Sequence, residues 1–502
     1  MATTFALRDS SIHLIDSHDD VAVAIRDLEA GEAVAAGALT IEIAETIPRG
    51  HKVALRHIGA GEEIRKYGWP IGRARSNISP GSLVHTINLA TQLSGLDAYE
   101  YQPAAPLSPT SCDDSTFMGY RRANGRVGTR NEIWILTTVG CVTRTAQRIA
   151  RIGAHRFAGR IEGVHAFTHP FGCSQLGDDL ARTRSVLASL IAHPNAGGVL
   201  VVGLGCESNQ LDRLLAEVGA FDPARIRAFS AQAAQDEDDA GLKALEELVA
   251  TAEHDVREPC PLSTLTIGLK CGGSDGFSGI TANPLVGNIA DRVAIAGGTP
   301  ILTEIPEVFG AEPLLMRRAL DRKVFDDVVA VVNRFKQYFL DHGQPIYENP
   351  SPGNLAGGIT TLEEKSLGAI QKGGQTQVTQ VVGYGQRALA PGLALLESPG
   401  NDAISSTALV AAGATLLLFT TGRGTPLGFP VPTLKIASNT DLATRKPRWI
   451  DFDAGRILSG LSPAAAAAEL LQLVLDTASG KPARNELNDE REVAIWKSGV
   501  TL

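Results

Sequence analysis

The chain of 502 residues divides into three stretches with different patterns of apolar and polar positions. In the first hundred residues, short runs with alternating side chains, such as 39–43 and 52–55, are separated by Gly and Pro turns, which predicts a small β-rich module. A stretch rich in Pro, Ser and Asp follows at 102–115 and is typical of a linker. Beyond it, apolar runs alternate with helical patterns, which predicts a doubly wound parallel sheet.

These patterns suggest domain boundaries and a few well-marked helices. In the less regular last part, Ser462 is placed to cap a helix that Pro463 begins and Gly480 ends. The predicted helices lie around 143–151, 182–191, 210–218 and 463–479. The predicted domains are a β-rich domain over 1–101, a linker over 102–118, an α/β domain over 119–260 and a second α/β domain over 261–502.

Composition narrows the class of protein. A chain of this length with 44% hydrophobic residues is too long for a single core. The net charge of -9 speaks against nucleic acid as a partner, because binding to phosphate backbones needs basic surface. We find no leader-like start and no uninterrupted apolar span of about 18 residues, so we expect neither secretion nor membrane insertion but a cytoplasmic protein. The widely spaced cysteines agree with a reducing compartment.

Four of the six cysteines follow directly on apolar, strand-like runs and have glycine neighbours. The carboxyl ends of parallel strands meet at one edge of a sheet, where ligands bind, so this pattern predicts four thiols on one side of one sheet. Burial in the core would explain any one of them, but the shared pattern favours a metal site at a catalytic crevice. The four are Cys141, Cys173, Cys206 and Cys271, and the two outside the pattern are Cys112 and Cys260.

Two carboxylates, Glu304 and Glu307, follow the apolar run 294–302 and offer ligands for a hard cation, groups for proton transfer, or helix caps. Thiolates favour softer metals than carboxylates such as these and Asp275 do, so the sequence leaves the metal open. An iron–sulfur cluster on three of the four cysteines is an alternative to a single iron, although the spacing fits no ferredoxin motif. Paired Cys-x-x-Cys knuckles are absent, which disfavours structural zinc.

Two glycine-rich loops carry more polar groups than packing requires. The loop 271–283 strings hydroxyl, carboxylate and amide groups along a flexible backbone, which suits a polyhydroxylated ligand. In the loop 420–425, the guanidinium of Arg423 would clamp a carboxylate, or alternatively a phosphate. The predicted binding residues of the two loops are Ser274, Asp275, Thr281 and Asn283, and Thr421, Gly422 and Thr425.

Histidine is sparse, with 11 in the chain. His169 lies four residues before Cys173 and could act as a ligand or as a general base. His51 and Lys52 lie together in a predicted strand of the first module. Without a chemical task at the crevice this pair would be ordinary surface, so we expect the module to close over the crevice of its own chain.

Several segments resemble the altronate and galactarate dehydratase family, and the resemblance extends to 497–501 and covers nearly the whole chain. It implies an amino-terminal SAF-type β domain, a flavodoxin-like α/β domain and a carboxyl-terminal α/β domain of unusual topology. It also implies a divalent metal, Fe2+ or Mn2+, adds Asn354 to the substrate-binding residues, and fits a homodimer that acts on a small sugar acid. The matching segments are 120–131, 138–141, 172–179, 205–207, 271–284, 350–354 and 420–426.

The resemblance implies dehydration of D-altronate to 2-keto-3-deoxy-D-gluconate in hexuronate catabolism, with galactarate or another aldonate or aldarate as the alternative substrate. We expect His169 or Lys52 to be the base, and His51 or a metal-linked water to be the acid. A metal on the cysteines and Glu304 would stabilise the intermediate together with Arg423. A non-catalytic sensor of sugar acids is the rival interpretation, since fold does not dictate function.

Overall fold

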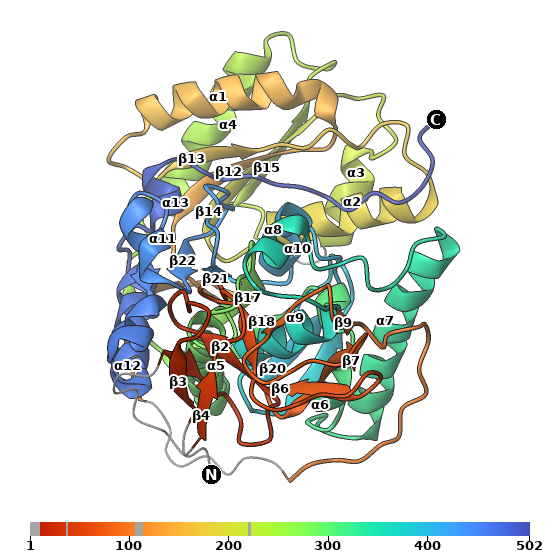
Figure 1. Ribbon diagram of the computed structural model, residues 1–502. Coiled ribbons are helices and arrows are strands. Elements are labelled where there is room, and N and C mark those ends of the chain that lie inside the picture. Colours follow the sequence, from red (N-terminus) through yellow and green to blue (C-terminus); the bar gives the residue numbers. More distant parts are fainter. Residues whose placement is uncertain (1–10, 37–38, 106–113, 219–221) are drawn as a thin grey trace.

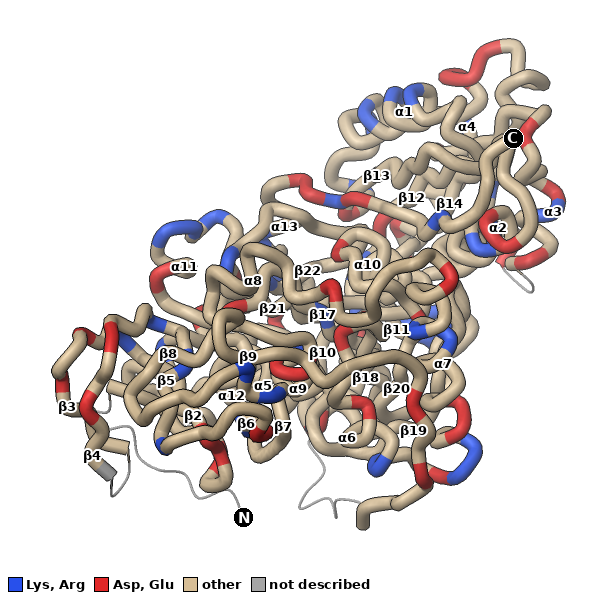
Figure 2. Tube along the Cα trace, turned by 45° about the vertical axis from the view of Figure 1, so that its right-hand side comes forward, with Lys and Arg blue, Asp and Glu red and all other residues tan. Residues whose placement is uncertain are grey.

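The computed structural model describes residues 11–36, 39–105, 114–218 and 222–502. It is a mixed α/β protein of several domains, and its described strands form six sheets (Figure 1). Cys112 and part of the predicted linker lie outside the described residues. Charged residues of both signs are spread over all parts of the chain (Figure 2). In the described part of the chain no helix is both long and apolar enough to cross a membrane.

The amino-terminal part consists of short antiparallel strands joined by turns, which confirms the predicted β-rich module. One sheet has the order β1-β2-β5-β8, a second β6-β7-β9, and β3 pairs with β4. Buried aliphatic side chains between the strands form its core. The strands are β1 (Ile12–His13), β2 (Val21–Ala24), β3 (Ala33–Ala36), β4 (Leu39–Glu42), β5 (Lys52–Ala54), β6 (Glu63–Lys66), β7 (Trp69–Ala74), β8 (Leu83–Val84) and β9 (Leu89–Ala90).

A parallel sheet of order β13-β12-β14-β15 follows. Its strand β14 is buried along its whole length, as a strand covered by helices on both faces must be. The helices predicted around 143–151, 182–191 and 210–218 are found as α1, α2 and α3. The elements are β12 (Glu132–Thr137), α1 (Thr143–Arg156), β13 (Val164–Phe167), α2 (Gly177–Ile191), β14 (Ala196–Gly203), α3 (Leu211–Val218), β15 (Ile226–Ser230) and α4 (Glu237–Ala252).

A small antiparallel sheet, β11-β10-β16, brings together the two chain segments that flank this unit. Its strands are β10 (Thr116–Arg121), β11 (Val127–Gly128) and β16 (Glu258–Pro261). Cys260 is fully buried in β16, away from any strand-end crevice.

The last part holds a seven-stranded parallel sheet of order β19-β20-β18-β17-β21-β22-β23. From β17 the chain adds strands first on one side, with β18, and later on the other, with β21. Such a reversal opens a crevice at the carboxyl ends of the strands, where ligands bind in α/β proteins. The strands are β17 (Thr266–Cys271), β18 (Thr299–Leu302), β19 (Val378–Val382), β20 (Leu393–Leu396), β21 (Leu416–Thr421), β22 (Thr433–Ala437) and β23 (Phe452–Asp453).

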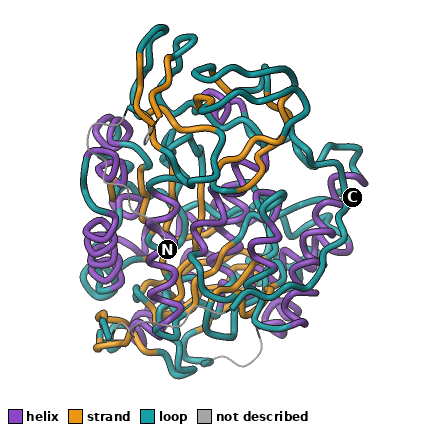
Figure 3. Tube along the Cα trace, turned by 60° about the horizontal axis from the view of Figure 1, so that its bottom comes forward, coloured by secondary structure: helices purple, strands orange, loops and turns teal. Residues whose placement is uncertain are grey.

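Helices border both parallel sheets, whereas the described amino-terminal part has strands and loops (Figure 3). The predicted helix at 463–479 is confirmed as α12: the Ser462 side chain accepts a hydrogen bond from Ala465 N, and Gly480 adopts a left-handed conformation just beyond the end. The helices of this part are α5 (Ala282–Ile295), α6 (Glu312–Met316), α7 (Arg322–Asp341), α8 (Pro352–Ala356), α9 (Leu362–Ala369), α10 (Asp402–Ala411), α11 (Thr440–Arg445), α12 (Pro463–Ala478) and α13 (Arg484–Leu487).

The amino-terminal module docks onto the loops that follow β17 and α8. Its Gly50, in a left-handed conformation, lies so close to Gly276 that a Cβ at Gly276 would be 2.0 Å from the Gly50 carbonyl oxygen. The His85 ring lies 3.1 Å from the Leu355 carbonyl oxygen. The module therefore docks on loops of its own chain that border the crevice, whereas its closure over the crevice stays a prediction.

A buried charge network, Lys52–Glu364–Lys66, fastens this contact. The Lys52 ammonium donates to Glu364 Oε2 at 2.8 Å, and Lys66 donates to Glu364 Oε1 at 2.7 Å. All three side chains are at most 1% exposed. Burial opposes ionisation of Glu364, but the two ammonium groups outweigh burial and lower its pKa to about 2. Burial lowers the pKa of Lys52 to about 8 despite the same carboxylate.

We predict that Glu364→Gln lowers the free energy of unfolding by about 3–5 kcal/mol, because it leaves two buried ammonium groups without a counter-ion. The ordinary pKa of Glu364 is 4.5 and its folded value about 2, so its contribution is present above pH 4.5 and is lost as the pH falls toward 2. The difference between wild type and variant in urea unfolding should shrink over that window. The control is Glu62→Gln, in an exposed pair with Arg56. Equal stability of wild type and Glu364→Gln at neutral pH would contradict the prediction.

Candidate functional site

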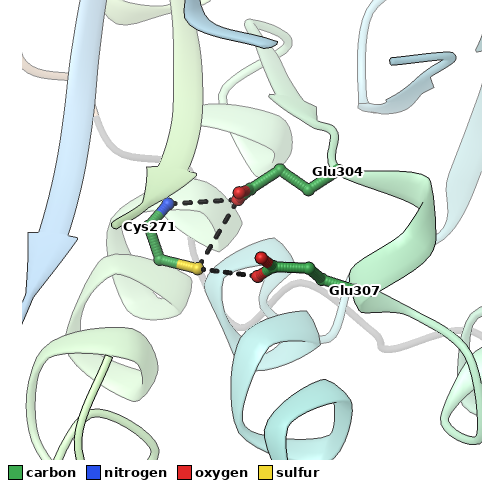
Figure 4. Close-up of side chains that lie close together, drawn as sticks. All are labelled: Cys271, Glu304 and Glu307. Carbon is green, nitrogen blue, oxygen red and sulfur yellow. Dashed lines mark hydrogen bonds between the residues drawn. The ribbon is translucent and has the colours of Figure 1, made fainter. Parts of the chain in front are cut away.

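Three side chains of types that can ligate a metal meet in the crevice of the seven-stranded sheet. Cys271 ends β17, and Glu304 and Glu307 follow β18 (Figure 4). The Cys271 Sγ lies 3.5 Å from Glu304 Oε2 and 3.4 Å from Glu307 Oε2. All three residues are buried, and among the described residues no other group of three His, Cys, Asp or Glu ligands is as compact, within 4.8 Å.

The backbone after β18 is shaped to aim both carboxylates at the thiol. Glu304 adopts a left-handed conformation with φ of 68°, and a short 3-10 helix, Ile305–Glu307, begins directly after it. A non-glycine residue in this conformation stores backbone strain, and such strain is frequent at functional sites. The Cys271 N–H donates to Glu304 Oε2 at 3.1 Å and fixes that carboxylate on the strand end.

Three buried lysines surround these carboxylates. Lys270 donates to Glu304, and also to Asp402 Oδ1 at 2.9 Å. Lys365 donates to Glu307 Oε1 at 2.9 Å. Lys372 lies 3.6 Å from Glu304 Oε2. Sequence reasoning missed all three; the one available signal was Lys270, a charge inside the apolar run 266–271.

Burial and charge set opposite protonation states in this cluster. Burial, with Glu304 nearby, raises the pKa of the Cys271 thiol to about 12, and burial also raises the pKa of Glu304. Burial opposes ionisation of Glu307 as well, but Lys365, Lys270 and Lys372 together lower its pKa to about 2. At neutral pH the site therefore holds a protonated thiol beside an ionised Glu307.

A cavity of about 200 Å³ opens beside Cys271 and Glu307. Asn354 belongs to its wall: its Nδ2 donates to the Ser274 carbonyl at 2.8 Å, and its Oδ1 lies 3.2 Å from Lys365 Nζ. The cavity thus offers thiol, ammonium, carboxylate, amide and hydroxyl groups, a set that suits a small acidic molecule with hydroxyl groups. It is lined by Cys271, Gly272, Gly273, Ser274, Glu307, Asn349, Ser351, Asn354, Lys365, Gly400 and Asp402.

Of the other binding residues predicted in loop 271–283, three support the loop itself. Asp275 accepts hydrogen bonds from Ser278, Ser438 and Asn439 side chains. Thr281 donates to the carbonyl groups of Phe277 and Ser438, and Asn283 donates to Gly368 O and accepts from Thr420. Asp275 and Asn283 line a much smaller space of about 10 Å³ next to the cavity, together with Ser274.

The predicted residues of loop 420–425 lie beside the cavity rather than in its wall. The Thr421 hydroxyl accepts from Gly424 N at 2.8 Å, and that of Thr425 accepts from Leu427 N at 3.2 Å. Gly422 and Arg423 both donate a backbone N–H to the Gly273 carbonyl. The Arg423 side chain is exposed next to that cavity loop.

The prediction that four cysteines share one sheet is wrong. Cys271 ends a strand of the seven-stranded sheet, whereas Cys141, Cys173 and Cys206 follow β12, β13 and β14 of the four-stranded sheet and are exposed. A strand followed by a cysteine does occur four times. The prediction failed because the chain builds two parallel sheets, and β17, which carries Cys271, belongs to the second one.

The predicted acid–base residues do not line the cavity. His169 is buried; its Nε2 donates to Thr137 O at 2.9 Å and its Nδ1 accepts from Phe171 N, so no lone pair is left for a base. Burial lowers its pKa to about 4. Lys52 is enclosed in the network with Glu364, and His51 lies half-buried directly before β5, with its ring centroid 5.4 Å from that of His85.

Comparison with known proteins gives three matching family models. Residues 11–92 match the altronate/galactarate dehydratase SAF domain, 119–253 the second domain of D-galactarate dehydratase/altronate hydrolase, and 262–501 the carboxyl-terminal domain of D-galactarate/altronate dehydratase.

Three curated relatives match over nearly the whole chain. Altronate dehydratase of Escherichia coli (strain K12) is 50% identical, over 97% of this chain and 99% of the relative. Altronate dehydratase of Bacillus subtilis (strain 168) is 49% identical over the same shares. Galactarate dehydratase (L-threo-forming) of Escherichia coli (strain K12) is 35% identical over 92% of each chain.

The cysteine environments predict an order of chemical modification. Since the thiolate is the reactive form, in protein freed of bound metal the buried Cys271 with its raised pKa should react slowly with iodoacetamide, whereas the exposed Cys141, Cys173 and Cys206 should react first. Mass spectrometry of tryptic peptides after timed labelling measures this order, and denatured protein supplies the control in which all thiols react. Labelling of Cys271 in the folded protein as fast as Cys141 would contradict the site geometry.

Proposed function

The chain belongs to the D-galactarate/altronate dehydratase family, and we propose that it dehydrates D-altronate to 2-keto-3-deoxy-D-gluconate. The observation that carries this proposal is the identity of 50% and 49% to two altronate dehydratases over nearly their whole length. Galactarate, or another aldonate or aldarate, is the second candidate, because a galactarate dehydratase is 35% identical over 92% of the chain.

The reaction removes the C2 proton and the C3 hydroxyl of the sugar acid as water, and the enol that remains rearranges to the 2-keto acid. The difficult step is loss of a proton next to a carboxylate, because negative charge builds up on carbon and oxygen already close to a charge. Preorganised positive groups in a buried site stabilise such charge far better than water does. Lys365, in the cavity wall, is the cation best placed for this task, with Lys270 and Lys372 behind it.

The residues around Cys271 fit a divalent metal such as Fe2+ or Mn2+. Glu304 Oε2 and Glu307 Oε2 face the sulfur, while the other oxygen of each carboxylate is held by a lysine, so the thiol and two carboxylate oxygens would be the ligands. This mixture of one soft and two hard donors suits a borderline metal, and binding would displace the thiol proton. A metal held there would act as a Lewis acid toward substrate oxygens.

The chain's own polar groups would bind and orient the sugar acid. Ser274, Asn349 and Asn354 bring hydroxyl and amide groups to the cavity wall, and Lys365 holds Glu307 in its ionised form. The exposed Arg423, fixed through its backbone to Gly273, remains a candidate for the far end of the substrate. Positioning of this kind supplies much of a catalytic effect, because it fixes the reacting geometry.

Strand order supports the finer fold assignment. Counted from β12, the four-stranded sheet has the order 2-1-3-4, which is the first part of the flavodoxin-like order 2-1-3-4-5. The seven-stranded sheet, counted from β17, has the order 3-4-2-1-5-6-7, in which the third and fourth strands both lie beyond the second. We propose that this placement of the third and fourth strands is what makes the topology of the carboxyl-terminal domain unusual.

The substrate assay tests the proposal directly. Protein supplied with Fe2+ or Mn2+ should release a 2-keto-3-deoxy acid from D-altronate at a higher kcat/KM than from galactarate, measured as keto acid over time. Faster turnover of galactarate would reassign the substrate. Binding of both acids without release of water would favour the sensor.

Substitution of Glu307 tests whether the crevice takes part in the reaction. Glu307→Gln should lower kcat/KM by roughly 100- to 1,000-fold, because it removes a charged group from a buried, preorganised site. Its affinity for Mn2+, measured by calorimetry, should fall as well, and chelation of the metal should stop turnover of the wild type until Mn2+ is returned. Glu62→Gln, on the exposed surface of the amino-terminal module, is the matched control. Full activity of Glu307→Gln would remove this crevice from the mechanism.

A further inference from the structure

We propose that Cys141, Cys173 and Cys206 bind an iron–sulfur cluster at the carboxyl edge of the four-stranded sheet. The three residues follow β12, β13 and β14, which are neighbours in the order β13-β12-β14. All three side chains are exposed. Thiols most often lie buried when they serve only packing, so three exposed ones at three adjacent strand ends call for another explanation.

Hydrogen bonds fasten the three cysteine loops to one another. The Gly140 N–H, next to Cys141, donates to Phe171 O at 2.8 Å, two residues before Cys173. Asn209, three residues after Cys206, donates from its backbone to Gly172 O at 2.9 Å, and from its side chain to Thr138 O at 3.1 Å. The loops therefore form one preorganised surface rather than three independent turns.

The backbone beside the thiols is built for close approach. Gly172 and Gly205, which directly precede Cys173 and Cys206, have φ of 98° and 132°, values that side chains rarely allow. A Cβ at Gly172 would lie 2.0 Å from Thr138 O, so only glycine lets this loop pack against the end of β12. The glycines thereby fix where the following thiols emerge.

The carboxylate nearest in sequence to these thiols is engaged elsewhere. The carboxylate of Glu207, which follows Cys206, is turned inward and accepts hydrogen bonds from Thr138, Leu204 N and Gly205 N. The polar contacts of the thiols are with Gln232 Nε2, 3.5 Å from Cys206 Sγ, and with Ser174 Oγ, 3.8 Å from Cys173 Sγ. Amide donors near a sulfur ligand are compatible with a cluster, whose potential depends on such hydrogen bonds.

The three sulfurs are too widely spaced to be the ligands of one tetrahedral ion. A tetrahedral ion with bonds of about 2.3 Å to sulfur holds its ligands within roughly 4 Å of one another. The three sulfurs do not all lie within 4.8 Å of one another, since they do not form one of the compact ligand groups of the described residues. A cluster spans a wider gap because each thiolate binds a different iron. Three protein ligands on a four-iron cluster leave one iron open to water or to another oxygen ligand.

This inference does not rest on the proposed function. The cluster is assigned to the four-stranded sheet, and the cavity with Cys271 belongs to the seven-stranded one. Content and spectra of the cluster are measured without turnover. A protein that binds no cluster would therefore not contradict the proposed dehydration, and a protein without dehydratase activity would not contradict the cluster.

The test is anaerobic reconstitution of the full-length protein with Fe3+, sulfide and excess dithiothreitol, which reduces part of the iron to Fe2+, followed by removal of unbound ions. We expect roughly four iron atoms and four acid-labile sulfides per chain, a broad visible absorption, and an electron paramagnetic resonance signal after reduction. Cys141→Ser, Cys173→Ser and Cys206→Ser should each lose most of the sulfide and of the visible absorption, and the triple variant should lose all of it.

Two matched variants guard against loss through misfolding. Cys260→Ala, buried in β16, and Cys271→Ala, in the other sheet, should keep the full cluster content. Circular dichroism checks that each Ser variant remains folded. Wild-type protein free of labile sulfide after reconstitution would overturn the proposal. So would iron bound without sulfide, or a folded triple variant that keeps the cluster.

Discussion

Three buried carboxylates, two at the crevice and one below the docked amino-terminal module, are each held by lysine, and this pairing of buried charges is what the site depends on. An ion taken out of water loses several kcal/mol of hydration, which only a close counter-ion and hydrogen bonds offset. Glu304 meets Lys270, Glu307 meets Lys365, and Glu364 lies between two ammonium groups. Buried lysines of the same domain thus supply the counter-ions for the carboxylates of the crevice.

Helix α9 joins these pairs into one system. Three consecutive residues of this buried helix reach three different partners: Glu363 binds Thr91 and Gln92 of the amino-terminal module, Glu364 binds Lys52 and Lys66, and Lys365 binds Glu307 in the crevice. Adjacent residues on a helix point in directions about 100° apart, so three consecutive side chains of one turn can contact three different partners. Helix α9 therefore links the module to the crevice as one rigid element, in addition to the loop contacts of Gly50 and His85.

Local pattern was sufficient for the strands, for the turns of the first module and for α12, because alternation, caps and glycine stops act within a few residues. The positions of Cys271 and Glu304 after strands could be predicted from the same local patterns. Membership of a sheet was not, since it depends on pairing between distant segments, and four similar strand–cysteine units were assigned to one sheet although the chain builds two. His169 was misjudged because nothing in its neighbours shows that Thr137 O and Phe171 N take both ring nitrogens. The buried lysines were missed because lysine is ordinarily a surface residue.

The Lys52–Glu364–Lys66 network also limits how the protein can be recombined. An amino-terminal module taken from another protein and fused before β10 would bring its own residues to the positions of Lys52 and Lys66. Without two cations there, the buried Glu364 carboxylate of the recipient would have no counter-ion, and helix α9, which carries it, would be destabilised. Exchange of this module between proteins is therefore feasible only for donors and recipients that match in these three charges.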